Sequence, residues 1–229
     1  MGTILIIAAY GVYAAFWLRV FLHALAWWKT ETGRFSPVGP SPSTIKTWAL
    51  TLRDVVLLWR LLKVNPALWL GEWVFHVSFL AVLLRHLRYF LEPVPSWVWW
   101  LQVPGLIAGY VLPLSLLYIL AVRLLSEREK YSSPANLFLL GLVLAISSMG
   151  VMMHAFFRLD LAGVKLFVLG ILAMNPAPLP VSALFLAHFV LVLVLVVFLP
   201  THILTAPLVM LEARKRDLAL PMVMHETDE

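Results

Sequence analysis

The chain of 229 residues is 62% hydrophobic and only 13% charged, which is more apolar than a water-soluble core of this size needs. It contains no cysteine, which excludes disulfide bonds, thiolate-bound iron–sulfur clusters, thiolate-bound zinc and cysteine nucleophiles. The formal charge of +5 comes from lysines and arginines distributed as in the cytoplasmic loops of membrane proteins, so it does not indicate a nucleic-acid partner.

Five apolar stretches are long enough to cross a bilayer core, which takes roughly 20 helical residues. The first begins at Thr3-Ile4 without a basic segment or a small-residue cleavage site, so we expect a retained helix and no signal peptide. Asn65-Pro66, Ser133-Pro134 and Pro180 are helix-start signals for the second, fourth and fifth stretches. The predicted spans are about 4–28, 66–90, 97–122, 135–157 and 181–211.

Two connections between the spans carry patterns of their own. In the loop 29–65, the segment "TIKTWALTLRDVVLLWRLLK" is amphipathic and basic, which predicts a helix lying on the membrane surface. After the fourth span, "LAGVKLFVLGIL" is too short to cross and predicts a second interfacial or partly inserted element. The cluster Trp97, Trp99 and Trp100 fits an aromatic belt at a membrane interface.

The basic residues predict the orientation of the spans, because cytoplasmic loops carry an excess of lysine and arginine. One side receives Lys29, Arg34, Lys46, Arg53, Arg60, Lys63, Arg123, Arg128, Lys130, Arg214, Lys215 and Arg216, against Arg85, Arg88, Arg158 and Lys165 on the other. The sequence therefore predicts a single all-α integral membrane domain over 1–229, with five transmembrane helices. Its N-terminus would lie outside and its C-terminus in the cytoplasm, as a multi-pass protein of the cell inner (cytoplasmic) membrane.

In this topology the second span runs outward and the fifth runs inward, and each carries two histidines. Ten residues from His76 to His86 rise about 15 Å, and fourteen from His188 to His202 rise about 21 Å. If His86 pairs with His188 and His76 with His202, the two histidines of each pair differ in membrane depth in the same direction. A shift of the start of the fifth helix, a tilt, or a kink at Pro200 can remove both differences. The alternative pairing, His86 with His202 and His76 with His188, leaves depth differences of opposite sign, which no shift of the helix can remove.

Two histidine pairs that bridge two helices at two depths are what two b-type haems with two axial ligands each require. Neutral imidazole is the usual axial ligand, and without cysteine there is no c-type attachment motif. Coordination would also satisfy polar nitrogens that are costly at membrane depth. Arginines beside the pairs are candidates for the haem propionates: Arg85 and Arg88 outside, and Arg19 inside.

Other readings of the histidines remain open at this point. A membrane histidine often serves as a hydrogen-bonding residue between helices instead of a ligand. His23 lies near the predicted inner pair and His154 near the outer one, so either could replace a ligand or line a cavity. The chain could also be a haem-free anchor that assembles a complex, or a transporter subunit whose histidines relay protons.

The histidine-bearing segments carry a resemblance to known proteins. "FHVSFLAVLLRH" and "LFLAHFVLVLVLVVFLPTHILTAPL" resemble helices two and five of the γ subunit of respiratory nitrate reductase. They are equally similar to the membrane cytochrome subunit of the sulfite-reductase-linked menaquinol complex of sulfur-metabolising prokaryotes. "FRLDLAGVKLFVLGIL" before a histidine-bearing last helix resembles the second of these more closely, and the resemblance covers most of the chain from about residue 66.

The resemblance implies a dihaem cytochrome b subunit of a respiratory complex, with His86 and His188 on the outer haem and His76 and His202 on the inner one. Such a subunit exchanges electrons with a quinone near the outer haem and with a cytoplasmic iron–sulfur subunit near the inner one. Substrate chemistry would then lie in partner subunits. Quinone-site candidates near the outer end of the fourth span are His154, Arg158, Asp160 and Lys165, although the last three could equally be interfacial anchors or ion pairs.

Overall fold

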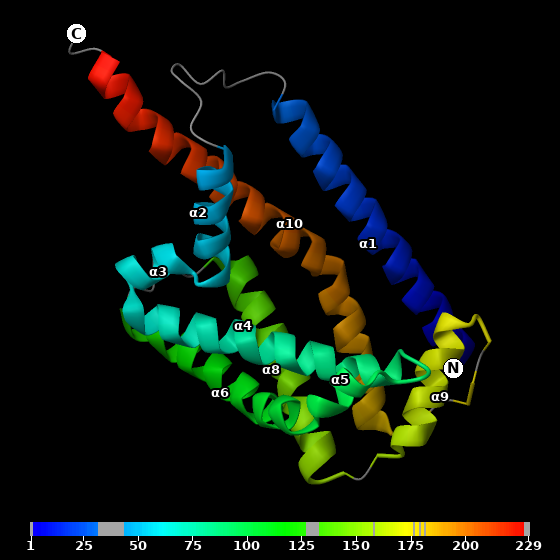
Figure 1. Ribbon diagram of the computed structural model, residues 1–229. Helices are drawn as coiled ribbons and strands as arrows, with labels where there is room; N and C mark the ends of the chain where they lie inside the picture. Colours follow the sequence, from blue (N-terminus) through cyan, green and yellow to red (C-terminus); the bar gives the residue numbers. More distant parts are fainter. Residues whose placement is uncertain are drawn as a thin grey trace. The chain divides into compact units, whose positions relative to one another are not determined.

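The computed structural model describes residues 2–31, 44–126, 133–157, 159–175, 177–178, 180 and 182–226. Within these ranges every regular element is helical and none is a strand, which confirms the all-α prediction (Figure 1). Contacts divide the chain into a first unit, Met1–Val12 with Asn65–Leu195, and a second unit, Tyr13–Val64 with Val196–Glu229. The elements are α1 Gly2–Glu31, α2 Thr44–Val56, α3 Trp59–Val64, α4 Pro66–His86, η1 Leu87–Tyr89, α5 Ser96–Trp100, α6 Gln102–Ser126, α8 Pro134–Ala155, α9 Leu161–Leu172 and α10 Ala183–Glu226.

Five of the described helices are long and apolar enough to cross a membrane: Thr3–Ala26, Pro66–Tyr89, Gln102–Leu125, Pro134–Ala155 and Ala183–Pro200. These confirm the five predicted spans. The third begins at Gln102 instead of about residue 97, because the tryptophan cluster forms the separate short helix α5 before it. The fifth span is the first part of a longer helix, since α10 continues to Glu226.

Local capping accounts for where the spans begin. The side chain of Asn65 accepts a hydrogen bond from the backbone N–H of Leu68 at 2.9 Å, and proline follows at the first helical position of α4. Ser133 caps α8 in the same way, so both of these predicted start signals are confirmed. At α10 the signal was misplaced: Ser182 accepts from the N–H of Phe185 at 3.3 Å, and Pro180 lies before the helix.

The first unit is organised around the packing of α4 on α6, which run side by side in Figure 1. A Cβ built on Gly71 of α4 would lie 2.7 Å from Cδ1 of Tyr118 and 2.8 Å from Cγ1 of Ile119 on α6. Small residues permit such close approach between membrane helices. The same two helices are joined by an ion pair, in which Arg123 Nη2 lies 2.6 Å from Glu72 Oε1.

The short apolar helix α9 coincides with the predicted segment "LAGVKLFVLGIL". Asp160 caps it, since Oδ1 accepts from the N–H of Ala162 at 3.1 Å. Phe167 is fully buried, and its ring meets the rings of Phe185 and Phe189 of α10 edge-on. α9 is therefore packed against the beginning of α10 within the first unit.

In the second unit, the amphipathic segment predicted after residue 44 forms two helices, α2 and α3. The face of α2 that carries Thr47, Thr51 and Asp54 is buried, whereas Trp48 and Leu52 on the other face are 57% and 64% exposed. α2 therefore buries its polar face and exposes its apolar face, which is the reverse of a surface helix on a water-soluble core.

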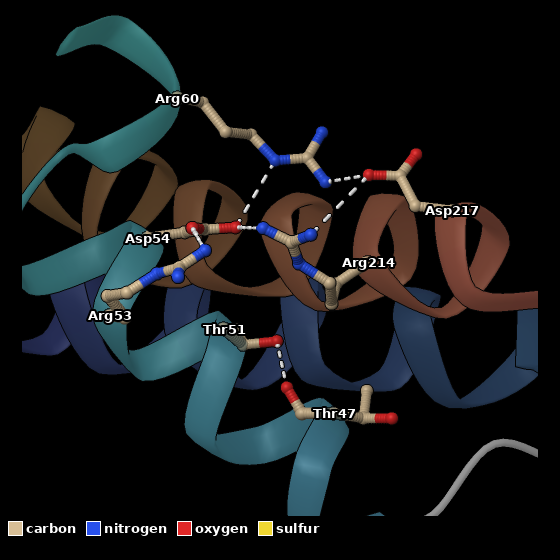
Figure 2. Close-up of polar contacts among 7 residues, drawn as sticks. All are labelled: Thr47, Thr51, Arg53, Asp54, Arg60, Arg214 and Asp217. Atoms are coloured by element: carbon tan, nitrogen blue, oxygen red, sulfur yellow. Dashed lines mark hydrogen bonds and ion pairs between the residues drawn. The ribbon is translucent and has the colours of Figure 1, made fainter. Parts of the chain in front are cut away.

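The buried face of α2 is held by charge. Figure 2 shows the Asp54 carboxylate among three guanidinium groups, those of Arg53 and Arg60 nearby in sequence and that of Arg214 on α10. Arg60 Nη2 also lies 2.5 Å from Asp217 Oδ2. This Asp54 cluster joins α2 and the beginning of α3 to the charged part of α10.

Candidate functional site

The predicted outer ligands, His86 on α4 and His188 on α10, both lie in the first unit. His86 Nδ1 lies 2.7 Å from the carbonyl oxygen of Val82, and His188 Nδ1 lies 3.0 Å from that of Ile146 on α8. Because a carbonyl oxygen only accepts, Nδ1 carries the proton in each ring, and a neutral ring keeps its lone pair on Nε2. A ring oriented by a carbonyl at one nitrogen is typical of metal-binding histidines.

Helix α8 determines the position of the His188 ring. Ile146 supplies the carbonyl, and one turn further along the helix a Cβ built on Gly150 would lie 3.7 Å from His188 Cε1. The absence of a side chain at Gly150 leaves room beside this imidazole.

The two arginines predicted to meet haem propionates on the outer side differ in their surroundings. The Arg85 side chain lies against Gly105 of α6, and its buried Nε has no hydrogen-bond partner among the residues that the structure describes. A buried donor of this kind fits an anionic group supplied by a cofactor. Arg88 is already engaged, because it donates to Gln102 Oε1 at 3.0 Å and to the hydroxyl of Tyr89 at 2.5 Å.

On the predicted inner side, His76 Nδ1 lies 2.6 Å from the carbonyl oxygen of Glu72, which again places the lone pair of a neutral ring on Nε2. The side chain of His202 lies outside the described residues, and its helix segment belongs to the second unit. The pairing of His76 with His202 stays a prediction. Arg19 donates to the carbonyl oxygen of Val197 at 2.8 Å within that second unit.

Sequence reasoning missed Arg123 and Glu72 as a polar pair in the first unit. Each side chain is about 15% exposed, and the Nε of Arg123 is buried without a partner in the described part of the chain. Glu72 lies one turn before His76 on α4. Arg123 is therefore a further candidate donor to an anionic group near the predicted inner ligand.

Of the four quinone-site candidates, His154 is the one that contacts another polar side chain on a different span. Its Nδ1 lies 3.0 Å from the hydroxyl of Tyr110 on α6, a residue for which the sequence offered no signal because the contact is tertiary. Asp160 caps α9 and Lys165 pairs with Glu92, which agrees with the anchoring alternative. Arg158 lies outside the described residues.

The donor set fits haem better than a chelated metal ion. Across the described ranges, no three side chains of His, Cys, Asp or Glu gather as a metal-chelating group. Axial ligation of a haem needs only two imidazoles, one above and one below the ring. At the predicted outer site, His86 and His188 lie on two helices with their rings oriented by carbonyl oxygens, and the partnerless Nε of Arg85 suits a propionate, so these residues are the candidates to hold a haem.

The described helices and this donor set define an all-α chain built to cross a membrane several times, with His86 on one of its spans and His188 on another. Over 149 residues it is 31% identical to the Hdr-like menaquinol oxidoreductase cytochrome b-like subunit of Archaeoglobus profundus, and 33% identical to the subunit of that name from Archaeoglobus fulgidus. This similarity confirms the predicted resemblance to the membrane cytochrome subunit of a menaquinol complex.

These alignments take in 58% of this chain and 44% and 45% of the two relatives, so the chain spans less than half of their length. No family model matches the chain. No solved structure matches it either.

Proposed function

We propose that this chain is a dihaem cytochrome b subunit of a respiratory complex in the cytoplasmic membrane. It moves electrons between the quinone pool near the outer face and a cytoplasmic iron–sulfur subunit. The observation that carries the proposal is how the outer pair is held: His86 on α4 and His188 on α10 lie in the same unit, and each has its Nδ1 bonded to a backbone carbonyl oxygen. The names of the two Archaeoglobus relatives, which describe a cytochrome b-like subunit of a menaquinol oxidoreductase, support it.

In this proposal the protein holds each haem through Nε2 of two histidines. At the outer site the carbonyl oxygens of Val82 and Ile146 keep the rings of His86 and His188 oriented, and Arg85 offers its unpartnered Nε to a propionate. At the inner site His76 and His202 are the ligands. The bound haem supplies a one-electron couple of ferric and ferrous iron.

The direction we propose is quinol oxidation at the outer face, with protons released outside and electrons passed inward. The topology behind it has an external N-terminus and rests on the excess of basic residues in the predicted cytoplasmic segments. Those segments, 29–65 and "EARKRD", offer basic surface for docking an electron-transfer subunit. Terminal substrate chemistry belongs to the partner subunits.

The haem content of the purified protein tests this function. From haem-replete membranes we expect two b haems per chain and a reduced-minus-oxidised α band typical of b haem. His86→Ala and His188→Ala should each lose one haem and the reaction with quinol, whereas His225→Ala in the polar tail should keep both. A protein without haem would favour the anchor or transporter alternatives. If either ligand variant keeps two haems, the assignment is wrong and His154 is the first substitute to test.

A further inference from the structure

Tyr110 and His154 form a polar pair across α6 and α8 inside the predicted membrane spans. The hydroxyl of Tyr110 lies 3.0 Å from His154 Nδ1, and the two rings meet edge-on with centroids 5.9 Å apart. The ring of Tyr110 is 40% exposed, and His154 is exposed as well. Polar groups are costly at membrane depth, so an exposed pair of this kind marks a functional site.

The surface around the pair is apolar. On α6, Ile107 and Leu114 lie one turn to either side of Tyr110 and are 59% and 64% exposed, and Phe157 after His154 is 52% exposed. A Cβ built on Gly109, the neighbour of Tyr110, would meet nothing within 4 Å. This surface suits a ligand with an apolar body and a polar oxygen that arrives through the lipid, and it does not suit a water-soluble substrate.

Helix α8 connects this pair to the outer ligand His188. The carbonyl oxygen of Ile146 contacts the imidazole of His188, Gly150 lies one turn further along α8, and His154 one turn beyond that. Four residues rise about 6 Å and turn the helix by roughly 40° beyond a full circle, so these three positions share one side of α8. A ligand hydrogen-bonded to His154 is therefore held about one helical turn from the residues that position His188.

We propose that Tyr110 and His154 bind one hydroxyl of a quinol at the outer face, with Tyr110 a residue of that site; this rests on the proposed function. When Nδ1 donates to the oxygen of Tyr110, Nε2 of His154 accepts from a quinol hydroxyl. When the Tyr110 hydroxyl donates to Nδ1, Nε2 carries the proton and donates to a quinone carbonyl. The two tautomers thus suit the reduced and the oxidised form of one ligand.

The same pair gives the proton a path. Oxidation breaks two O–H bonds of the quinol, forms two carbonyl groups, and releases two protons and two electrons. A haem held by the outer pair would accept the electrons one at a time and pass each one on. The proton of the bound hydroxyl passes to Nε2 of His154, Nδ1–H passes its proton to the oxygen of Tyr110, and the Tyr110 hydroxyl gives up its own proton to water. The second hydroxyl loses its proton to water at the opposite end of the ring.

The test compares Tyr110→Phe and His154→Gln with wild-type holoprotein in lipid nanodiscs. The probe is a short-chain menaquinol, and haem reduction is followed by stopped-flow absorbance from pH 5.5 to 8.5. We expect haem reduction to slow about a hundredfold in His154→Gln, at the lower end of the range for loss of a general base, and by less, about tenfold, in Tyr110→Phe, which keeps that base. The pH dependence of the rate should flatten in both, while haem content and reduction by dithionite stay at wild-type values.

Tyr118→Phe is the matched control, because Tyr118 lies on the same helix and its side chain is also 40% exposed. It should reduce haem at the wild-type rate. If Tyr110→Phe behaves like Tyr118→Phe in rate, KM and pH profile, the pair is only a contact between helices and the proposal is overturned. Loss of a haem in His154→Gln would also overturn it, by making His154 a ligand. Absence of haem from the wild-type protein would instead refute the proposed function.

Discussion

The Asp54 cluster permits a quantitative prediction about what holds α2 in place. The side chain of Asp54 is 0% exposed, and its carboxylate accepts from Arg60 at 3.3 Å and from Arg214, which is itself 15% exposed. Asp54→Asn keeps the shape but removes the charge, which leaves a largely buried guanidinium without its counter-ion. Breaking a buried pair costs about 3–5 kcal/mol. Here Asp217 remains as a second partner and Arg60 is 32% exposed, so we expect about 2 kcal/mol.

Hydrogen exchange measures that loss directly in lipid nanodiscs. A local opening free energy reduced by about 2 kcal/mol speeds exchange roughly 30-fold, since 1.36 kcal/mol corresponds to a factor of ten. The amides of Thr44–Val56 should show this in Asp54→Asn, and those of α8 should not. Lys46→Gln, an exposed charge change on the same helix, is the control. If the two variants exchange alike, the Asp54 cluster does not hold α2 and the reasoning is refuted.

The same cluster predicts how α2 responds to pH. Burial by itself would raise the pKa of Asp54, but hydrogen bonds from Arg214, Arg60 and Arg53, together with the charge of Arg214, hold it below the ordinary 3.8. A carboxylate with a depressed pKa stabilises the fold above its unfolded pKa, and this contribution is lost as pH falls through the folded value. Protection of α2, corrected for intrinsic exchange, should be flat from pH 5 to 8 and fall below pH 3.8, but Asp54→Asn should lack this acid-dependent loss.

Two further substitutions test packing and capping in the first unit. Gly71→Ala places a Cβ 2.7 Å from Tyr118 Cδ1 and should lower the unfolding free energy by about 1–3 kcal/mol in a detergent titration, whereas Gly141→Ala, with nothing within 4 Å, should not lower it. Asp160→Ala removes the cap of α9 and should speed exchange of its amides about fivefold, for a loss of about 1 kcal/mol, with the quinol reaction unchanged. Equal stability of the two glycine variants, or loss of quinol reactivity in Asp160→Ala, would contradict these assignments.

Features that depend on a few neighbouring residues were predictable from the sequence. Length and apolar character predicted the five spans, and the Asn65-Pro66 and Ser133-Pro134 signals marked the first residues of α4 and α8. The bounds of α9 follow from an apolar run that begins after the capping carboxylate of Asp160. In each case the physical cause lies within one continuous segment of the chain.

Features that depend on distant contacts were not predictable in the same way. In the sequence, Asp54 is not distinguishable from the other polar residues of a basic amphipathic helix. Only its contact with Arg214, 160 residues away, reveals that the polar face is the buried one. In the sequence, Tyr110 is one aromatic residue in an apolar span. Its contact with His154 becomes visible only when α6 and α8 are placed together in the structure. The histidine spacing within α4 and α10 could be read from each segment alone, whereas the pair across α6 and α8 could not.

Helix α8 shows why a search for ligands by histidine spacing was incomplete. Histidine spacing placed no ligand pair on α8 and left His154 only as a substitute ligand or a cavity residue, yet the Ile146 carbonyl of α8 orients His188 and His154 contacts Tyr110. A backbone carbonyl has no residue signature, so spacing arguments cannot find it. Because both contacts come from one rigid helix, a shift of α8 would move the ring of His188 and the Tyr110–His154 pair together. The distance between the proposed quinol site and the outer ligand is therefore set by α8, a helix on which histidine spacing placed no ligand pair.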